Sequence, residues 1–249
     1  DAPAPSSPPR DWRASLRIYL SPPSLRMLAL GFAAGVPLLL VLGTLSFRLR
    51  EAGIDRSTIG YFSWVGLAYG FKWVWAPLVD RVPLPGLTPW LGRRRAWLLL
   101  AQAGVMAGLI GLAAADPRVS LGAMVGWALA VAFASATQDI ALDAFRIESA
   151  PADEQPALAA SYQTGYRLAM IWAGAGVLWL AARAQGLAVG YDQAAWQLAY
   201  AVMAASMLLG VLTVLLSPEP APQPLARARG AGEWLRSALV EPFADFFRR

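Results

Sequence analysis

Residues Met27–Phe47, MLALGFAAGVPLLLVLGTLSF, indicate the fold class, because they include no Asp, Glu, Lys or Arg. A helix of about 20 apolar residues is long enough to cross the hydrocarbon core of a lipid bilayer. Glycine and proline residues inside this run, such as Gly31, Gly35 and Pro37, are common in membrane helices. The stretch therefore predicts a transmembrane helix.

Five further runs of the sequence share this composition. Two contain no charged residue, and three contain only isolated charges; they are Ala96–Ala115, Gln193–Pro218, Ser57–Val79 with Lys72, Val119–Phe145 with Asp139 and Asp143, and Gln155–Ala182 with Arg167. A soluble domain with this sequence would have to bury six long helices that are apolar around most of their circumference. We therefore predict an all-α membrane protein with six transmembrane helices.

The composition of the whole chain agrees with this fold class. Of its 249 residues, 57% are apolar and 15% are charged, whereas soluble domains have about 25% charged residues. The chain has no Cys and no His, which excludes a disulfide framework and His-based metal or triad chemistry. We therefore predict that the protein has no metal site and no cofactor, and that it is not an enzyme.

The distribution of basic residues predicts the orientation in the membrane. Fourteen of the 21 Lys and Arg residues lie on one side of the predicted spans and five on the other, and cytoplasmic loops hold the excess. The richer side holds Arg10, Arg13, Arg17, Arg26, Arg81, Arg93, Arg94, Arg95, Arg146, Arg227, Arg229, Arg236, Arg248 and Arg249; the poorer side holds Arg48, Arg50, Arg56, Arg118 and Arg183. Both ends of the segment are predicted to be cytoplasmic, and the net charge of +5 is attributed to topology rather than to nucleic-acid binding.

The sequence divides into three parts. Residues 1–24 are rich in Pro, Ser and Ala near their start and predict a disordered cytoplasmic lead. Residues 25–216 hold the six predicted spans, and residues 217–249 predict a cytoplasmic linker followed by an amphipathic segment. This order suggests the first half of a larger permease, followed by a C-terminal half.

Four charged residues lie inside predicted spans: Lys72, Asp139, Asp143 and Arg167. Such groups cost several kcal/mol unless they are paired or hydrated. Lys72 and Asp139 lie about 10 Å and 9 Å from the same predicted boundary, so we expect one polar cluster, with Gln138 beside it, around a central cavity.

Two interpretations of these charges stay open. The carboxylates of Asp139 and Asp143 carry a coupling proton, since desolvation and mutual repulsion favour the protonated form, or the charges only tie the helices together. Asp143 is alternatively solvated at the boundary.

Two other pairs on the predicted helices have alternative interpretations. Tyr162 and Tyr166 are one helical turn apart and close to Arg167, which suits a sugar or an anionic group, and which simple helix packing explains as well. Gly31 and Gly35 have the spacing of a close helix contact.

The loop after the second predicted span has a characteristic order of charges. Asp80 and Arg81 are followed, after ten intervening residues, by Gly92, Arg93 and Arg94. Taken singly, these arginines anchor the loop on the cytoplasmic side. In this order the five residues resemble the loop motif of the major facilitator superfamily, interrupted by an insertion and with Ala76 where that motif usually has Gly.

Longer phrases resemble one branch of that superfamily, the AmpG-type muropeptide permeases. In chain order they are Leu30–Leu38, Thr58–Ser63, Tyr69–Pro77, Gly92–Leu98, Ser135–Ala144 and Gly165–Met170. The resemblance implies a twelve-helix transporter of the bacterial inner membrane, which imports anhydro-muropeptides with protons for cell-wall recycling and beta-lactamase induction. It implies that Ala136, Gln138 and Asp139 are the functional residues of the fourth span, and that Lys72 and Arg167 line the cavity.

The alternatives to this function are a related facilitator with another cargo, such as acetyl-CoA, a sugar or a peptide, and a non-transporting factor that assembles membrane complexes. The partners expected for a muropeptide permease are the anhydro-muropeptide, protons, membrane lipid and the C-terminal half of the same permease.

Overall fold

A computed structural model describes residues 17–187, 189–221 and 236 of the chain. Most of the predicted disordered lead lies outside these residues. So do the predicted linker beyond Ala221 and, apart from Arg236, the predicted amphipathic segment.

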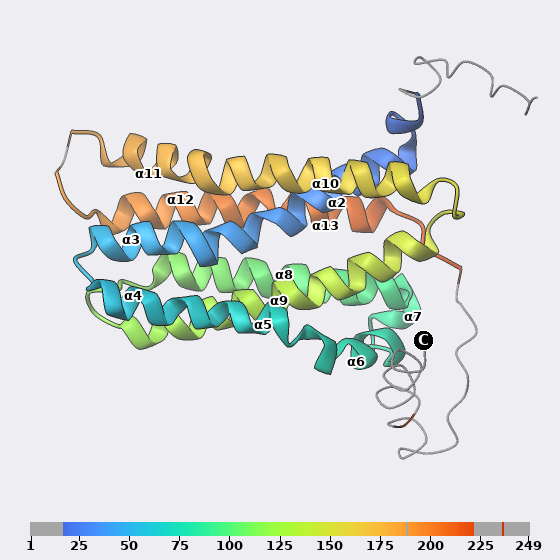
Figure 1. Ribbon diagram of the computed structural model, residues 1–249, viewed down its shortest axis with the longest axis horizontal. Coiled ribbons are helices and arrows are strands. Elements are labelled where there is room, and N and C mark those ends of the chain that lie inside the picture. The colour runs from blue at the N-terminus through green and yellow to red at the C-terminus, as the bar shows by residue number, and fades with distance from the viewer. Residues whose placement is uncertain (1–16, 188, 222–235, 237–249) are drawn as a thin grey trace, which may run out of the picture.

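The described residues form a bundle of helices that run close to the long axis of the molecule (Figure 1). Five helices are long and apolar enough to cross a membrane, and they are Pro22–Glu51, Arg93–Ala114, Leu121–Glu148, Gln155–Gln185 and Gln193–Leu216. No strand occurs among the residues that the structure describes. The all-α class is therefore confirmed for the described residues, and five of the six predicted spans are present as helices long and apolar enough to cross a membrane.

The second predicted span, Ser57–Val79, is not one continuous helix. It consists of α4 (Arg56–Phe62), a 3₁₀ turn (Ser63–Gly66), α5 (Leu67–Gly70), a second 3₁₀ turn (Lys72–Val74) and α6 (Ala76–Arg81). Pro77, in the first turn of α6, supplies no backbone N–H to the preceding turn. The glycines at 66 and 70 weaken the helix further. Hydropathy alone does not report these interruptions.

Two of the long helices contain a π-helical turn, and the two turns contact each other. The first helix joins α2 (Pro22–Leu39) to α3 (Leu45–Glu51) through Leu40–Thr44, and the fourth joins α10 (Gln155–Ile171) to α11 (Val177–Gln185) through Trp172–Gly176. The buried Thr44 hydroxyl donates a hydrogen bond to the Ala173 carbonyl at 2.7 Å. This bond satisfies a carbonyl that the wider turn would otherwise leave short of a partner.

The remaining helices complete the bundle. They are α7 (Thr88–Leu91), α8 (Arg93–Ala114), α9 (Leu121–Glu148), α12 (Gln193–Ser206) and α13 (Leu208–Leu216). Helices α8 and α9 pack closely along their length, and α8 also packs on α12. The Tyr200 hydroxyl of α12 donates to the Leu40 carbonyl at 3.2 Å, so α12 is tied to the π-helical turn of the first helix.

The closest packing is between α2 and α10, and glycines make it possible. A Cβ atom at Gly31 would overlap the backbone carbonyl of Tyr162, and one at Gly35 would overlap the backbone of Tyr166. Gly165 faces the Leu28 carbonyl in the same way from the other helix. The structure therefore places Gly31 and Gly35 at a close helix contact, as the spacing predicts.

Gly165→Ala is expected to destabilise the bundle by roughly 1–3 kcal/mol, because its methyl group would force α2 and α10 apart. The control is Gly126→Ala in α9, where an added Cβ meets nothing within 4 Å, so this change should stabilise the helix slightly. Thermal unfolding of both purified variants measures the difference. Equal melting temperatures would contradict the packing argument.

Candidate functional site

The structure pairs two of the charges predicted inside the spans. Lys72 Nζ lies 3.7 Å from Asp139 Oδ2, between the second 3₁₀ turn and α9. The side chain of Asp139 is 18% exposed and that of Lys72 is 37% exposed, so the carboxylate is the more buried partner. This contact agrees with the expectation that the two groups share a depth in the bundle.

The residues around Lys72 are held on α9 by a second contact. Trp75 Nε1 donates to Thr137 Oγ1 at 3.1 Å, and the Trp75 ring lies 4.6 Å from the ring of Phe133. These contacts flank the Lys72–Asp139 pair on the same helix. They hold Trp75, three residues from Lys72, against α9, although the backbone is interrupted at Phe71 and Trp75.

Polar atoms beside this pair lack protein partners. Gln138 is 1% exposed, and neither its amide nitrogen nor its amide oxygen has a hydrogen bond to any described residue. The Oδ1 atom of Asp139 is likewise buried and without a hydrogen bond in that part of the chain. Since buried polar atoms are nearly always paired, these atoms are suited to bind water, a proton or a polar ligand. We call Lys72, Gln138 and Asp139 the α9 polar site.

The other two charges do not join this pair. Asp143 is 57% exposed and forms an ion pair with Arg146 at 3.7 Å, one turn along α9, which agrees with the alternative that it is solvated. Arg167 is exposed, and its Nη1 atom lies 3.8 Å from the sulfur of Met170. Of the predicted cluster of four charges, the structure therefore shows contact only between Lys72 and Asp139, while Asp143 and Arg167 each contact a neighbour on their own helix.

The remaining cavity candidates lie on α9 and α10. Ala136 is fully buried in α9. Tyr162 and Tyr166 are partly buried, their ring centroids are 6.0 Å apart, and Asp139 interacts electrostatically with both. The two tyrosines therefore lie near the α9 polar site, on the helix that packs against α2.

The predicted loop motif forms a second charged cluster at one end of the bundle. The Arg94 guanidinium lies between two carboxylates: Nη1 is 2.7 Å from Asp80 Oδ1, and Nε is 2.9 Å from Glu148 Oε2. These three residues connect α6, the start of α8 and the end of α9. A bidentate Arg–carboxylate contact is among the stronger ion pairs, so Arg94 fixes the three elements together.

The start of α8 also contacts the carboxylate of Glu219, which lies just after the last long helix. Glu219 accepts hydrogen bonds from the backbone N–H groups of Arg94 and Arg95 at 2.8 Å and 3.1 Å. Gly92 has φ +84°, and a Cβ there would overlap the Glu219 side chain. Glycine at this position is therefore required both by the backbone angle and by the carboxylate.

The other two motif residues mark the edges of this cluster. Arg81 is the last residue of α6. Arg93 is the first residue of α8 and lines a crevice with Thr88, Glu148 and Glu219.

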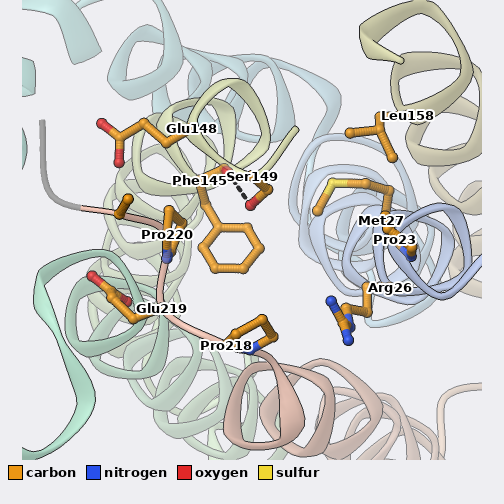
Figure 2. Close-up of a pocket in the computed structure, with 11 residues that line it drawn as sticks. Pro23, Arg26, Met27, Phe145, Glu148, Ser149, Leu158, Pro218, Glu219 and Pro220 are labelled. Carbon is orange, nitrogen blue, oxygen red and sulfur yellow. Dashed lines mark hydrogen bonds between the residues drawn. The ribbon is translucent and has the colours of Figure 1, made fainter. Parts of the chain in front are cut away.

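A cavity of about 230 Å³ lies beside the Arg94 cluster. Figure 2 shows that the start of α2 faces the end of α9 across it, and that Pro218–Pro220 closes another side. Arg26, Glu148 and Glu219 are the charged residues of its lining. Phe145, in this lining, is six residues or about 9 Å along α9 from Asp139, so the cavity is separate from the α9 polar site. The described residues contain no group of three or more acidic side chains arranged for a metal ion.

Sequence reasoning missed Glu148, Glu219 and Arg48. Glu148 ends α9 and pairs with Arg94, which lies 54 residues earlier at the start of α8, so no local signal in the sequence indicates the contact. Nothing local in the sequence indicates that Glu219 turns back onto α8. Arg48, placed above outside the predicted spans, is fully buried. It follows the buried residues Leu40 and Thr44 at four-residue spacing, which indicates that the helix continues with the same buried face.

Comparison with known proteins identifies transporters. A family model described as acetyl-coenzyme A transporter 1 matches residues 25–171. The chain is 40% identical over 235 residues to a protein of Escherichia coli K12 named anhydromuropeptide permease, a match that covers 94% of this chain and 44% of that protein. It is 34% identical over 224 residues to a protein of Rickettsia felis named putative transporter AmpG 4, covering 88% of this chain and 51% of that protein.

The chain therefore spans about half the length of these relatives. Their names describe a permease and a transporter, in agreement with the predicted transport protein rather than an enzyme, and with the resemblance to AmpG-type permeases.

Proposed function

Since the chain belongs to the transporter family described as acetyl-coenzyme A transporter 1, we propose that it forms the N-terminal part of a proton-coupled permease that imports anhydromuropeptides across the bacterial inner membrane. The name of the E. coli relative supports this cargo. A C-terminal half of similar length would complete the transport pathway, in keeping with the greater length of the relatives.

The observation that carries the proposal is the α9 polar site. A half-buried lysine and a more buried aspartate form an ion pair beside a glutamine whose amide has no partner among the described residues. Anhydromuropeptides present sugar hydroxyls, peptide amides and carboxylates, and these groups complement Gln138 and Lys72. Tyr162 and Tyr166 supply aromatic surface for a sugar ring.

We propose that the interrupted segment 56–81 is a sixth membrane crossing. It runs along the bundle from the end that holds α4 to the end that holds α7 (Figure 1). Non-helical backbone at membrane depth is tolerated where it lines a cavity or is covered by protein, and discontinuous helices commonly carry the binding site in transporters. With six crossings and the excess of arginine inside, both ends of the segment are cytoplasmic.

The proposed coupling uses the charge on Asp139. Protonation of its carboxyl removes the attraction for Lys72, which leaves the ammonium group free to bind an anionic part of the cargo. The two halves of the permease then rock about the site. At the cytoplasmic end, Arg94 with Asp80 and Glu148 holds α6, α8 and α9 as one rigid unit during this motion. Asp143 is the alternative proton carrier.

Uptake of labelled anhydromuropeptide tests the function. Cells that lack their own permease would express the full-length gene, with and without a protonophore. Accumulation that the protonophore abolishes is the expected result. Absence of accumulation, with the protein present in the membrane, would contradict the proposed cargo.

Acetyl-CoA is a second candidate cargo, because the matching family model carries that description. It would be favoured if membrane vesicles took up labelled acetyl-CoA, and if excess unlabelled acetyl-CoA, but not excess anhydromuropeptide, reduced that uptake.

A further inference from the structure

Two arginines lie close together at the end of the bundle opposite the Arg94 cluster (Figure 1). Arg50, near the end of α3, and Arg56, the first residue of α4, line one crevice of about 250 Å³. Ser46, Phe47 and Ile59 complete its lining. The crevice therefore combines two cations, one hydroxyl group and an apolar wall.

The acidic residues that neighbour these arginines are bound elsewhere. Glu51 accepts a hydrogen bond from Trp196 Nε1 at 2.6 Å. Asp55 accepts hydrogen bonds from Ser57 and Thr58, which hold the pKa of its carboxyl well below the usual range and keep it ionised at the start of α4. Neither Arg50 nor Arg56 forms a side-chain hydrogen bond or an ion pair with any residue that the structure describes. Both residues therefore line the crevice without a carboxylate partner among the described residues.

Packing accounts for other arginines at this end but not for these two. Arg48 is buried and donates hydrogen bonds to Leu112 of α8, to Ala115 just after α8, and to Gln193 of α12. Arg118 donates to the Ala52 carbonyl and lies 4.6 Å from the ring centroid of Tyr191. Arg50 and Arg56 are exposed and make no such contacts within the described part of the chain. Since basic residues are also disfavoured on the non-cytoplasmic side, neither packing nor topology explains this pair.

We propose that Arg50 and Arg56 form an oxyanion-binding site that takes a carboxylate of the cargo peptide at the outer entrance of the pathway. Guanidinium groups bind carboxylates through paired N–H donors, and the Ser46 hydroxyl adds a third donor. Phe47 and Ile59 contact the apolar part of the same peptide. The proposal rests on the proposed function for its cargo and for its side of the membrane. The site captures the cargo before it reaches the α9 polar site.

The test is a binding titration with the purified full-length protein in phosphatidylcholine nanodiscs. Two probes are used: an anhydromuropeptide with free peptide carboxylates, and the same molecule with these carboxylates amidated. Arg50→Gln/Arg56→Gln is expected to weaken binding of the acidic probe about tenfold and to leave binding of the amidated probe unchanged. Arg50→Lys/Arg56→Lys should lose less, because it keeps the charge. Arg183→Gln, which removes an exposed arginine of α11 outside the crevice, should match the wild type.

Uptake kinetics provide the second readout. The expected result for the double Gln variant is a KM raised about tenfold with kcat retained, since capture and not translocation is impaired. Equal binding of the acidic probe by the variant and the wild type would overturn the site, as would a wild type that binds neither probe. Charge-dependent binding without uptake would leave the site standing and refute the proposed function. A loss that appears only when phosphatidylglycerol is added would identify a lipid phosphate as the occupant and overturn the peptide assignment.

Discussion

Asp139→Asn is expected to abolish concentrative uptake while the protein remains folded in the membrane. Asparagine has nearly the shape of a protonated aspartate, so the packing between α9 and the residue 72–75 segment should survive. The variant cannot be ionised, and it therefore cannot alternate between holding and releasing Lys72, whose Nζ atom lies 3.7 Å from the carboxylate. Uptake of labelled anhydromuropeptide, normalised to the amount of protein in the membrane, measures the effect, and a loss of at least about 100-fold is expected, because an energetically uncoupled carrier does not accumulate its cargo.

The matched control is Asp143→Asn, which makes the same change one turn along α9. Asp143 is 57% exposed and pairs with Arg146, so this variant should retain most uptake. Undiminished accumulation by Asp139→Asn would remove the proton-coupling role, and the Lys72–Asp139 pair would then be a structural link between helices. Loss of uptake in Asp143→Asn alone would transfer the role to that residue.

The positions of the long helices follow from the sequence, whereas the contacts of the buried charges follow only in part. Long apolar runs predict where α2, α8, α9, α10 and α12 lie, because crossing a bilayer requires a minimum apolar length. The similar depth of Lys72 and Asp139 made their contact one of the expected pairings, since a charge inside a bilayer needs a partner at its own level. Whether two charges at a similar depth come into contact depends on the rotation of each helix about its axis, which depth does not determine. Arg167 has a suitable depth but points away from the pair.

Backbone irregularities were the other limit of prediction. Residues 57–79 are apolar enough for a span, yet Pro77 and two glycines interrupt the helix. The π-helical turns at 40–44 and 172–176 were not predicted, and the hydrogen bond from Thr44 to Ala173 joins residues 129 positions apart, which no local pattern encodes. The Glu219 contact with α8 joins residues about 125 positions apart, and no local pattern encodes it.

Arg48→Met is expected to cause the largest loss of stability of any variant considered. The Arg48 side chain is fully buried. Its Nη1 donates to the Leu112 carbonyl at 2.6 Å, and its Nη2 donates to the Ala115 carbonyl at 2.7 Å and to Gln193 Oε1 at 2.9 Å. The carbonyl groups at the end of α8 have no further helical partner, and the negative end of the helix dipole favours a cation there. Methionine fills a similar volume but donates nothing, so three acceptors lose a charged donor at once.

Hydrogen bonds to charged groups contribute about 1.5–3 kcal/mol each. Removal of the buried charge also removes its desolvation cost, and this offsets part of the loss. We therefore expect a decrease of roughly 3–5 kcal/mol in the free energy of unfolding, which corresponds to a melting temperature lower by on the order of 10 °C. Arg183→Met, at an exposed position of α11, is the control and should change the melting temperature by less than about 2 °C. Thermal unfolding in detergent compares the two. A small shift for Arg48→Met would mean that water replaces the guanidinium at the end of α8.

Arg48→Lys separates the charge of the side chain from its hydrogen bonds, because lysine keeps the charge but cannot reach all three acceptors. The melting temperature of this variant should therefore fall between those of the Arg48→Met variant and the wild type.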